Sequence, residues 1–355
     1  MKHILTIVGA RPQFIKSAAI SHTIRDKYSH IISEDVLHTG QHYDETMSGR
    51  FFSELDIPLP KYNLNVGSCS HGKQTALMLS GIEEILISNA YDGVLVYGDT
   101  NSTLAGALAA SKLHIPVYHV EAGLRSFNRN MPEEINRILT DHVSNLLFAP
   151  TQTAVQNLRD EGFKEKEIIF SGDVMMDNIR HYAPQNLSLP FLLPSFFLAT
   201  IHRDFNTDNL ERLKNILSAL NDISEQFSTD ILLPLHPRTR KVINSMDFDN
   251  ISTHFRITAP LSYLETLAAL QKAKLVLTDS GGLQKEANFC GKACVILRPE
   301  TEWVELVEDG SALLADANKK RIIEAAWVLI DKKVEPNRHF GNGNASEIIV
   351  KKIIS

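Results

Sequence analysis

The sequence of 355 residues lacks the marks of several protein classes. Its three cysteines, Cys69, Cys290 and Cys294, form no CxxC pair and have no neighbouring cluster of histidine and acidic residues. An odd number of widely spaced cysteines argues against a disulfide framework, and no HExxH or His-x-His spacing indicates a metal site. We therefore expect a reduced, cytoplasmic protein without bound metal.

Long hydrophobic runs and an excess of basic residues are also missing. The apolar run at residues 3–9 is too short for a signal peptide or a membrane span. The net charge of −6 and the pI of about 6.2 give no reason to expect nucleic acid or an anionic membrane as a partner. Any phosphate binding must then be local. The hydrophobic content of 43% is ordinary for a globular protein, and the length favours two domains.

Short apolar runs alternate with longer helical patterns along the whole chain, which is typical of βαβ units and parallel sheets. The expected strands lie at residues 3–9, 31–38, 93–97, 116–120, 146–149, 167–171, 196–201, 230–235, 254–258, 275–278, 293–297 and 311–315. The proline-containing segment 181–195 is the predicted linker. The expected fold is α/β, with two doubly wound, Rossmann-like domains at residues 1–180 and 190–338 and a cleft between them.

The segment Asp-Ser-Gly-Gly-Leu-Gln-Lys-Glu at 279–286 directly follows the expected strand 275–278. It predicts a helix that opens on two glycines, where the backbone can approach a ligand and the first N–H groups of the helix attract an anion. A nucleotide diphosphate is the ligand that we expect there. Taken alone, the segment is equally compatible with an ordinary strand-to-helix turn.

The first expected strand runs into Gly-Ala-Arg-Pro-Gln-Phe-Ile-Lys at 9–16, which lacks the GxGxxG pattern of dinucleotide sites. Arg11 and Lys16 stand at this turn, where cations can clamp a diphosphate. In the second half, His202 and His236 follow two further expected strands. Histidines in such positions suit proton transfer or phosphate contact, although each alone is more often an ordinary loop residue.

Three carboxylates stand at strand ends or at a helix start. Asp99 follows the strand 93–97, Glu121 follows 116–120, and Glu133 lies in the first turn of a helix that opens on Met-Pro. Helix capping could account for Asp99, and the helix dipole for Glu133. Glu133 and Arg137 are spaced i, i+4 and so share one helix face. We expect the three carboxylates to converge, with mutual repulsion raising the pKa of some of them for proton transfer.

Six segments together resemble the non-hydrolysing UDP-N-acetylglucosamine 2-epimerase family, and they occur in the family's order. They are GARPQFIK at 9–16, TGQHYD at 39–44, GDTNSTLAGALAA at 98–110, HVEAGLRS at 119–126, MPEEINR at 131–137 and DSGGLQKEA at 279–287. The resemblance implies a two-domain fold of the GT-B glycosyltransferase kind, with a C-terminal helix at about 340–355 that packs back onto the first domain. It also implies a homodimer, no cofactor, and a role in making precursors of bacterial surface polysaccharides.

The resemblance also implies roles for single residues. Its catalytic group falls on Asp99, Glu121, Glu133, Arg137, His202 and Lys16. Its UDP contacts fall on Arg11, His236, Ser280, Gly281, Gly282 and Glu286, the last similar to the carboxylate that holds the ribose hydroxyls. Some bacterial relatives are activated by their own substrate, and Gln41, His42 and Arg203 lie in the corresponding motifs.

Two departures concern the substrate. Phe205 stands where the family commonly has Glu in His-Arg-x-Glu-Asn, and Asp204 could replace that carboxylate. Residues 298–305, Arg-Pro-Glu-Thr-Glu-Trp-Val-Glu, differ from the Thr-Glu-Arg-Pro-Glu of simple UDP-GlcNAc epimerases. With residues 126–130 they resemble the branch that contains UDP-2,3-diacetamido-2,3-dideoxyglucuronate 2-epimerases. That substrate carries a C6 carboxylate, for which Arg125, Arg129 or Arg298 could supply a cation.

The chemistry of C2 inversion limits the mechanism. The C2 hydrogen is not α to a carbonyl, and no nicotinamide fingerprint offers transient oxidation. Elimination of UDP to a 2-acetamidoglucal, followed by re-addition, needs a stabilised leaving group and acid–base groups on two faces. Hydrolysis to N-acetylmannosamine and UDP, a GT-B glycosyltransferase and an inactive sugar-nucleotide sensor are the alternatives.

Overall fold

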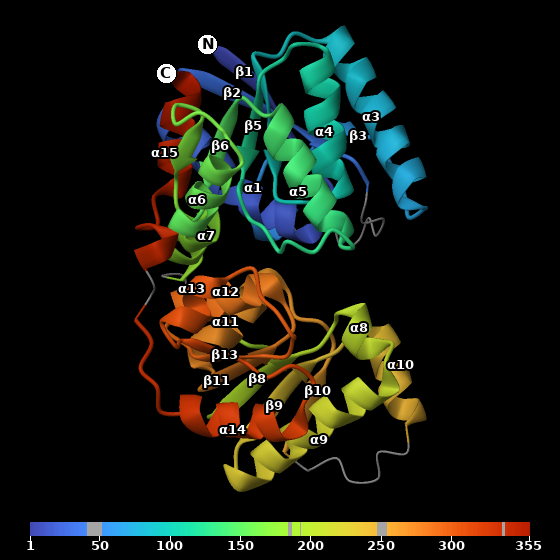
Figure 1. Ribbon diagram of the computed structural model, residues 1–355, viewed down its shortest axis with the longest axis vertical. Coiled ribbons are helices and arrows are strands. Elements are labelled where there is room, and N and C mark those ends of the chain that lie inside the picture. Colours follow the sequence, from blue (N-terminus) through green and yellow to red (C-terminus); the bar gives the residue numbers. More distant parts are fainter. Residues whose placement is uncertain (41–51, 184–186, 192, 247–253, 336–337) are drawn as a thin grey trace. The chain divides into compact units, whose positions relative to one another are not determined.

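The computed structural model describes residues 1–40, 52–183, 187–191, 193–246, 254–335 and 338–355. The chain forms two compact units (Figure 1). Unit 1 contains residues 1–181 and 338–355, and unit 2 contains residues 182–337. Within the described ranges, no helix has the length and apolar character needed to cross a membrane.

Unit 1 is built on a parallel sheet of seven strands in the order β3-β2-β1-β4-β5-β6-β7. The strands are β1 (Lys2–Val8), β2 (Ile32–His38), β3 (Tyr62–Asn63), β4 (Gly93–Tyr97), β5 (Val117–Val120), β6 (Leu146–Ala149) and β7 (Ile168–Phe170). The helices are α1 (Arg11–Thr23), the π-helical η1 (Ile24–Tyr28), α3 (His71–Ser88), α4 (Asn101–Lys112), α5 (Pro132–Val143), α6 (Gln152–Asp160), α7 (Val174–Tyr182), the 3₁₀ turn η2 (Arg338–Phe340) and α15 (Ala345–Ile354). The sequence did not predict β3, because two residues are too few to produce a periodic pattern.

Unit 2 is built on a parallel sheet of six strands in the order β10-β9-β8-β11-β12-β13. The strands are β8 (Phe196–Thr200), β9 (Asp230–Pro234), β10 (Phe255–Thr258), β11 (Leu275–Thr278), β12 (Cys294–Ile296) and β13 (Ala312–Leu314). The helices are α8 (Asp204–Thr207), α9 (Leu210–Gln226), α10 (Pro237–Ser245), α11 (Tyr263–Lys272), α12 (Gly281–Phe289), α13 (Val304–Glu308) and α14 (Lys319–Leu329).

Both strand orders reverse direction at one point, between β1 and β4 in unit 1 and between β8 and β11 in unit 2. Ligands of open α/β sheets bind outside the carboxyl ends of the strands at this switch point. The turns after these four strands begin at Gly9, Gly98, Ile201 and Asp279. The topology therefore gathers most of the predicted site residues at the two switch points.

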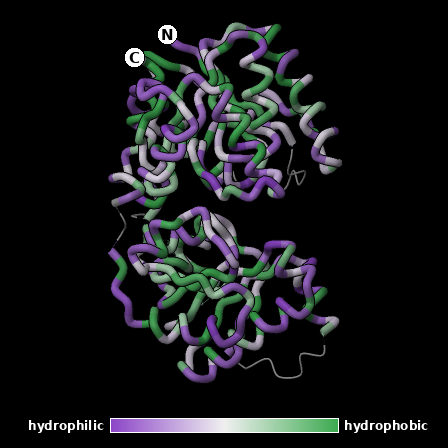
Figure 2. The backbone as a smooth tube through the Cα atoms, viewed as in Figure 1, coloured by the Kyte–Doolittle hydropathy of each residue, from purple (hydrophilic) through white to green (hydrophobic). Residues whose placement is uncertain are grey.

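Each sheet is buried between helices, so its central strands are apolar on both faces. The strands β4 and β11 are buried along their whole length, and Figure 2 shows hydrophobic residues concentrated along the central strands of each unit. On α9, the buried positions Leu213, Ile216, Leu217 and Leu220 recur every three or four residues, which is the spacing of one helix face.

The C-terminal helix α15, red in Figure 1, belongs to unit 1 and packs against α1. Its first turn is held by Asp177 of α7, which accepts hydrogen bonds from the N–H groups of Ala345 at 3.1 Å and Ser346 at 2.9 Å. Ser346 also accepts a hydrogen bond from Thr23 at 2.8 Å. The chain therefore passes from unit 1 to unit 2 and back again.

Candidate functional site

The first switch point is organised by Gln13, which the sequence did not single out. Its Oε1 accepts hydrogen bonds from the N–H groups of Gly9 at 2.8 Å and Ala10 at 3.1 Å. Its Nε2 donates to the carbonyl of Tyr97 at 2.9 Å. The side chain is fully enclosed. Gln13 thus joins the turn that carries Arg11, at the start of α1, to the end of β4.

Lys16 and Glu121 form an ion pair in this region, and both side chains are almost buried. Glu121 has a φ of +73°, an unusual value for a residue with a side chain. Gly98, with a φ of +64°, lies next to the pair. A Cβ at residue 98 would lie 3.2 Å from Glu121 Oε2 and 3.2 Å from Lys16 Nζ. Strained, closely packed backbone of this kind is often found at functional sites.

Asp99 pairs with Arg137 of α5, whose Nη2 lies 2.5 Å from Asp99 Oδ2. The other arm of the guanidinium, Nη1, lies 3.1 Å from Glu134 Oε2. Glu134 is buried and accepts hydrogen bonds from the N–H groups of Ser126 and Phe127, each at 2.9 Å. Burial alone would raise the pKa of Glu134, but these hydrogen bonds outweigh it and the pKa is lowered. Glu134 is therefore an ionised anchor for Arg137.

Glu133 has a different environment from the one that the sequence suggested. It is half-buried in the first turn of α5. It forms no hydrogen bond or ion pair with any residue that the structure describes. Although Glu133 shares a helix face with Arg137, the i, i+3 neighbour Glu134 forms the ion pair with Arg137. Asp99 and Glu121 each face a cation instead of the expected cluster of carboxylates.

A buried network beneath these residues was not predicted. Nδ1 of His119 on β5 lies 2.6 Å from Asp141 Oδ1, and Nε2 lies 2.8 Å from the carbonyl oxygen of Gly98. Because both ring nitrogens face acceptors, the orientation of the ring is fixed from both sides. Burial would raise the pKa of Asp141, but the charge and hydrogen bond of His119, together with Arg125, lower it. The network holds the peptide that precedes Asp99.

Arg125 is fully engaged in this network. Its guanidinium contacts Glu161 through Nε and Nη2, both at 2.7 Å, and lies 2.8 Å from Asp141. Its side chain is also almost completely buried. A guanidinium with two carboxylate partners has little left to offer a substrate carboxylate.

At the second switch point, His202 and Asp279 form a pair in which Nδ1 lies 3.0 Å from Oδ1. Asp279 follows β11, is completely buried, and also accepts the N–H groups of His202 and Arg203 at 3.1 Å. Burial would raise its pKa, but the hydrogen bond and charge of His202 and the bond from Asn206 outweigh this and lower the pKa. Asp279 therefore stays ionised and fixes the loop after β8.

The helix α12 begins beside this pair. Ser280 is its N-cap and accepts a hydrogen bond from Leu283 N at 3.3 Å. Gly282 is exposed, and a Cβ there would meet no atom of the described residues within 4 Å. A Cβ on Gly281 would lie only 2.6 Å from Glu302 Oε1. The start of α12 is therefore open at Gly282, as an anion site requires, and Glu286 is buried one turn further along.

The remaining predicted residues are more ordinary or lie elsewhere. His236 is exposed and caps α10, where its Nδ1 accepts the N–H of Arg238 at 3.3 Å. Arg203 is half-buried at the N-cap of α8. Gln41 and His42 lie outside the described residues. Phe205, at the position where the family commonly has Glu, is exposed, and its ring centroid lies 5.4 Å from the guanidinium carbon of Arg212.

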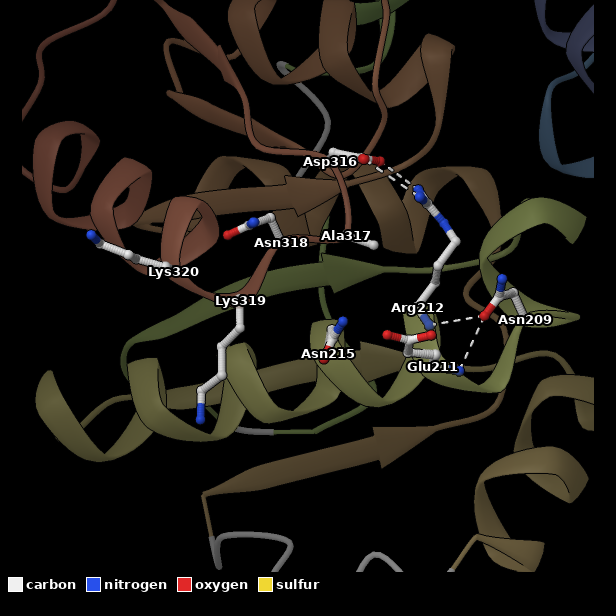
Figure 3. Close-up of a pocket in the computed structure, with 9 residues that line it drawn as sticks. All are labelled: Asn209, Glu211, Arg212, Asn215, Asp316, Ala317, Asn318, Lys319 and Lys320. Atoms are coloured by element: carbon white, nitrogen blue, oxygen red, sulfur yellow. Dashed lines mark hydrogen bonds and ion pairs between the residues drawn. The ribbon is translucent and has the colours of Figure 1, made fainter.

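An open pocket of about 530 Å³ lies at the starts of α9 and α14 (Figure 3). It is lined by Asn209, Glu211, Arg212, Asn215, Asp316, Ala317, Asn318, Lys319 and Lys320. None of these residues was predicted as a site residue. Arg212 and Asp316 face each other across it at 2.5 Å, so two of its charges neutralise one another.

Comparison with known proteins agrees with the motifs. The family model described as UDP-N-acetylglucosamine 2-epimerase matches residues 26–354. This chain belongs to the UDP-N-acetylglucosamine 2-epimerase family. It is 50% identical to a UDP-N-acetylglucosamine 2-epimerase homolog of Methanococcus maripaludis, over 98% of each chain. It is 49% identical to the UDP-2,3-diacetamido-2,3-dideoxy-D-glucuronate 2-epimerase of Pseudomonas aeruginosa, also over 98% of each chain.

A solved structure supports the same assignment. The UDP-GlcNAc 2-epimerase of Methanocaldococcus jannaschii, in complex with UDP-GlcNAc and UDP, matches with a TM-score of 0.88 and 43% identity over 99% of each chain. The family resemblance and the GT-B-like fold that the sequence suggested are therefore confirmed. The epimerase family consists of isomerases that act on UDP-sugars, so the chain is an enzyme of that class.

Proposed function

We propose that this epimerase interconverts UDP-N-acetylglucosamine and UDP-N-acetylmannosamine by inverting C2 of the sugar. The observation that carries the proposal is the arrangement at the first switch point. Asp99 and Glu121 follow the adjacent strands β4 and β5, each pairs with a cation, and a Cβ on Gly98 would lie 3.2 Å from Glu121 Oε2. Carboxylates positioned in this way are suited to removing a proton.

The reaction begins by elimination. A carboxylate removes the C2 proton, the C2–H electrons form the C1=C2 bond, and the C1–O bond breaks as UDP leaves with its electrons. Protonation of C2 on the opposite face and return of UDP to C1 then give the epimer. We assign this proton transfer to Asp99, Glu121 and Glu133, because two faces of the sugar need acid–base groups. Glu133 forms no hydrogen bond or ion pair with the described residues, so its carboxyl group is available to a substrate.

The departing UDP requires stabilisation of its negative charge. We assign the diphosphate to the start of α12, with the N–H groups at Ser280, Gly281 and Gly282 as donors and Glu286 at the ribose hydroxyls. The open position at Gly282 supports this assignment. Arg11, Lys16, His202 and His236 are the further candidates for contacts with the nucleotide.

A second candidate substrate is UDP-2,3-diacetamido-2,3-dideoxyglucuronate, with the same mechanism. Arg298 supports it. Nη2 of Arg298 lies 3.0 Å from Glu302, while Nη1 is buried without a hydrogen-bond partner among the described residues. Nη1 would lie 3.4 Å from a Cβ on Gly281. Arg125 is already engaged by Glu161 and Asp141, so Arg298 is the better candidate for a C6 carboxylate.

We further propose that the enzyme is a homodimer that forms through the helical layer of α3, α4 and α5. Ile135 and Leu139 are spaced i, i+4 on α5, and both are more than 40% exposed. Leu77 of α3 and Phe127, in the loop before α5, are exposed as well. Exposed apolar side chains are frequent at subunit interfaces. Light scattering should show a dimer for the wild type and a monomer for Leu139→Glu, whereas Val328→Glu on α14 should stay dimeric.

The reaction is tested by NMR in D₂O, with UDP-GlcNAc and the diacetamido-uronate analogue in separate samples. An epimerase incorporates deuterium at C2 and produces the second epimer of the substrate that it accepts. Release of stoichiometric UDP would instead identify a hydrolase. Absence of deuterium from C2 with both sugars would refute the epimerase and leave a glycosyltransferase or an inactive sugar-nucleotide sensor.

A further inference from the structure

Asp279 has a position that the proposed reaction does not yet use. It follows β11 and directly precedes Ser280, the N-cap of α12. Its carboxylate nevertheless contacts another segment of the chain. The carboxylate accepts Nδ1 of His202, the N–H groups of His202 and Arg203, and the side chain of Asn206. All of these donors come from the segment after β8, and β8 itself lies beside β11 in the sheet. Asp279 therefore ties the two strands of the switch point together through His202.

The network continues outward from Asp279. Asn206 Nδ2 donates to Asp279 at 3.1 Å and to the carbonyl of Leu297 at 3.0 Å. Asn206 Oδ1 accepts from Arg212 Nε at 3.0 Å. Arg212 is in turn fixed by Asp316 on the wall of the pocket in Figure 3. Two acceptors at Nδ2 and one donor at Oδ1 fix the orientation of the Asn206 amide.

We propose that Asp279 is a positioning residue that accepts a hydrogen bond from Nδ1–H of His202, so that the ring, when it carries a second proton on Nε2, donates Nε2–H to the departing diphosphate. Asn206 keeps Asp279 in place, and Arg212 keeps Asn206 in place. The inference rests on the proposed function in one respect, because His202 is taken there as a contact of the leaving group. A histidine that a buried carboxylate orients through Nδ1 is a recurrent arrangement at sites of proton transfer and charge stabilisation.

Three features of this arrangement support a functional pair over a purely structural one. His202 is 51% exposed, so the carboxylate orients a side chain that remains accessible to a ligand. Nε2 of His202 has no hydrogen-bond partner among the described residues. The anion site at Ser280 is the next residue after Asp279, so the ring and the start of α12 are held by one segment.

The decisive variant is Asp279→Asn, which keeps an acceptor for the main-chain N–H groups but allows the amide to present a donor to Nδ1. We expect kcat for the UDP-sugar to fall roughly a hundredfold, with KM changed by less than about threefold, since the α12 start is intact. In ¹⁵N spectra of histidine-labelled enzyme, the neutral ring of His202 should carry its proton on Nδ1 in the wild type and lose that preference in the variant. The His202→Gln protein identifies the signals.

Asp230→Asn is the matched control. Asp230 accepts from Nδ1 of His254 at 3.1 Å at the start of β9, so the substitution has the same chemistry in the same unit. It should alter the signals of His254 and leave kcat unchanged. If Asp279→Asn does not fold, Asn206→Ser removes the next link and should reduce kcat about tenfold, with the same loss of tautomer preference.

The proposal is wrong if the wild-type His202 ring is protonated on Nε2 in its neutral form, or if Asp279→Asn lowers thermal stability while kcat and the His202 signals stay as they were. This outcome does not depend on the identity of the sugar. If the tautomer is as expected but no deuterium enters C2 of either substrate, the proposed reaction fails while the positioning of His202 by Asp279 stands.

Discussion

Lys16 and Glu121 form an ion pair over the space left by the missing side chain of Gly98. A glycine with a positive φ at the end of β4 thus determines how closely a cation from α1 approaches a carboxylate from the loop after β5. The geometry of the pair depends on a third residue that carries no chemistry of its own.

Gly98→Ala should therefore impair catalysis more than stability. The positive φ costs an alanine roughly 1–2 kcal/mol of stability, and the new methyl group would press on both Lys16 and Glu121. We expect kcat to fall at least about tenfold, because small displacements of reacting groups are costly. Urea unfolding and initial rates measure the two effects. Gly72→Ala on α3 is the control, since no described atom lies within 4 Å of its Cβ; equal losses in both variants would contradict the argument.

The carboxylates should separate turnover from nucleotide binding. Asp99→Asn, Glu121→Gln and Glu133→Gln should each reduce kcat by at least roughly a hundredfold, while calorimetry finds UDP affinity nearly unchanged. Glu84→Gln, an exposed position of α3, removes the same charge and should retain full activity. Near-normal turnover in all three site variants would overturn the assignment of proton transfer.

Arg298 should determine which sugar is preferred. If its Nη1 binds a C6 carboxylate, Arg298→Gln should reduce kcat/KM for the diacetamido-uronate substrate roughly tenfold to a hundredfold more than for UDP-GlcNAc. Loss of one charge-assisted hydrogen bond accounts for a change of this size. Arg321→Gln is the control, because Arg321 is exposed on α14, a helix that carries none of the predicted site residues. Equal losses for both sugars would place Arg298 at the diphosphate.

Asp141 should make unfolding depend on pH in a predictable direction. Folding lowers the pKa of Asp141 from its unfolded value of 3.8. The stability that the ionised Asp141 contributes is therefore fully present above this value and is lost as the pH falls through the pKa of the folded state. Asp141→Asn should cost about 3 kcal/mol at neutral pH, because Arg125 and His119 lose a buried partner. Urea unfolding at pH 7 and at about pH 3 should show the difference from the wild type shrinking. Asp26→Asn, at an exposed pair, should show no such convergence.

The sequence predicted those features that depend on local pattern. Strand positions follow from runs of apolar residues, and Asp99, Glu121 and Ser280 could be placed at strand ends because each lies within two residues of the end of such a run. The partners of these residues were not predictable. Asp141 is 22 residues from His119 and meets it only because α5 packs against β5.

Helical spacing did not reveal the partner of Arg137. It placed Glu133 and Arg137 on one face, whereas the N–H groups of Ser126 and Phe127 hold the neighbouring Glu134 in the position that pairs with Arg137. The sequence also could not show that Arg125 is already paired, because its partner Glu161 lies at the end of α6. Tertiary hydrogen bonds determine which of two neighbouring residues forms a contact, and the pattern of one segment does not predict these bonds.

The packing of α15 on unit 1 has a consequence for the order of folding. Unit 2 is continuous in the sequence, whereas unit 1 is completed only by residues 338–355. Ile349, Val350 and Ile353 of α15 are buried in it. During synthesis, unit 2 can close its core while unit 1 still lacks α15. A nascent chain that stops before residue 338 would therefore leave unit 1 without the apolar side chains that α15 buries in it.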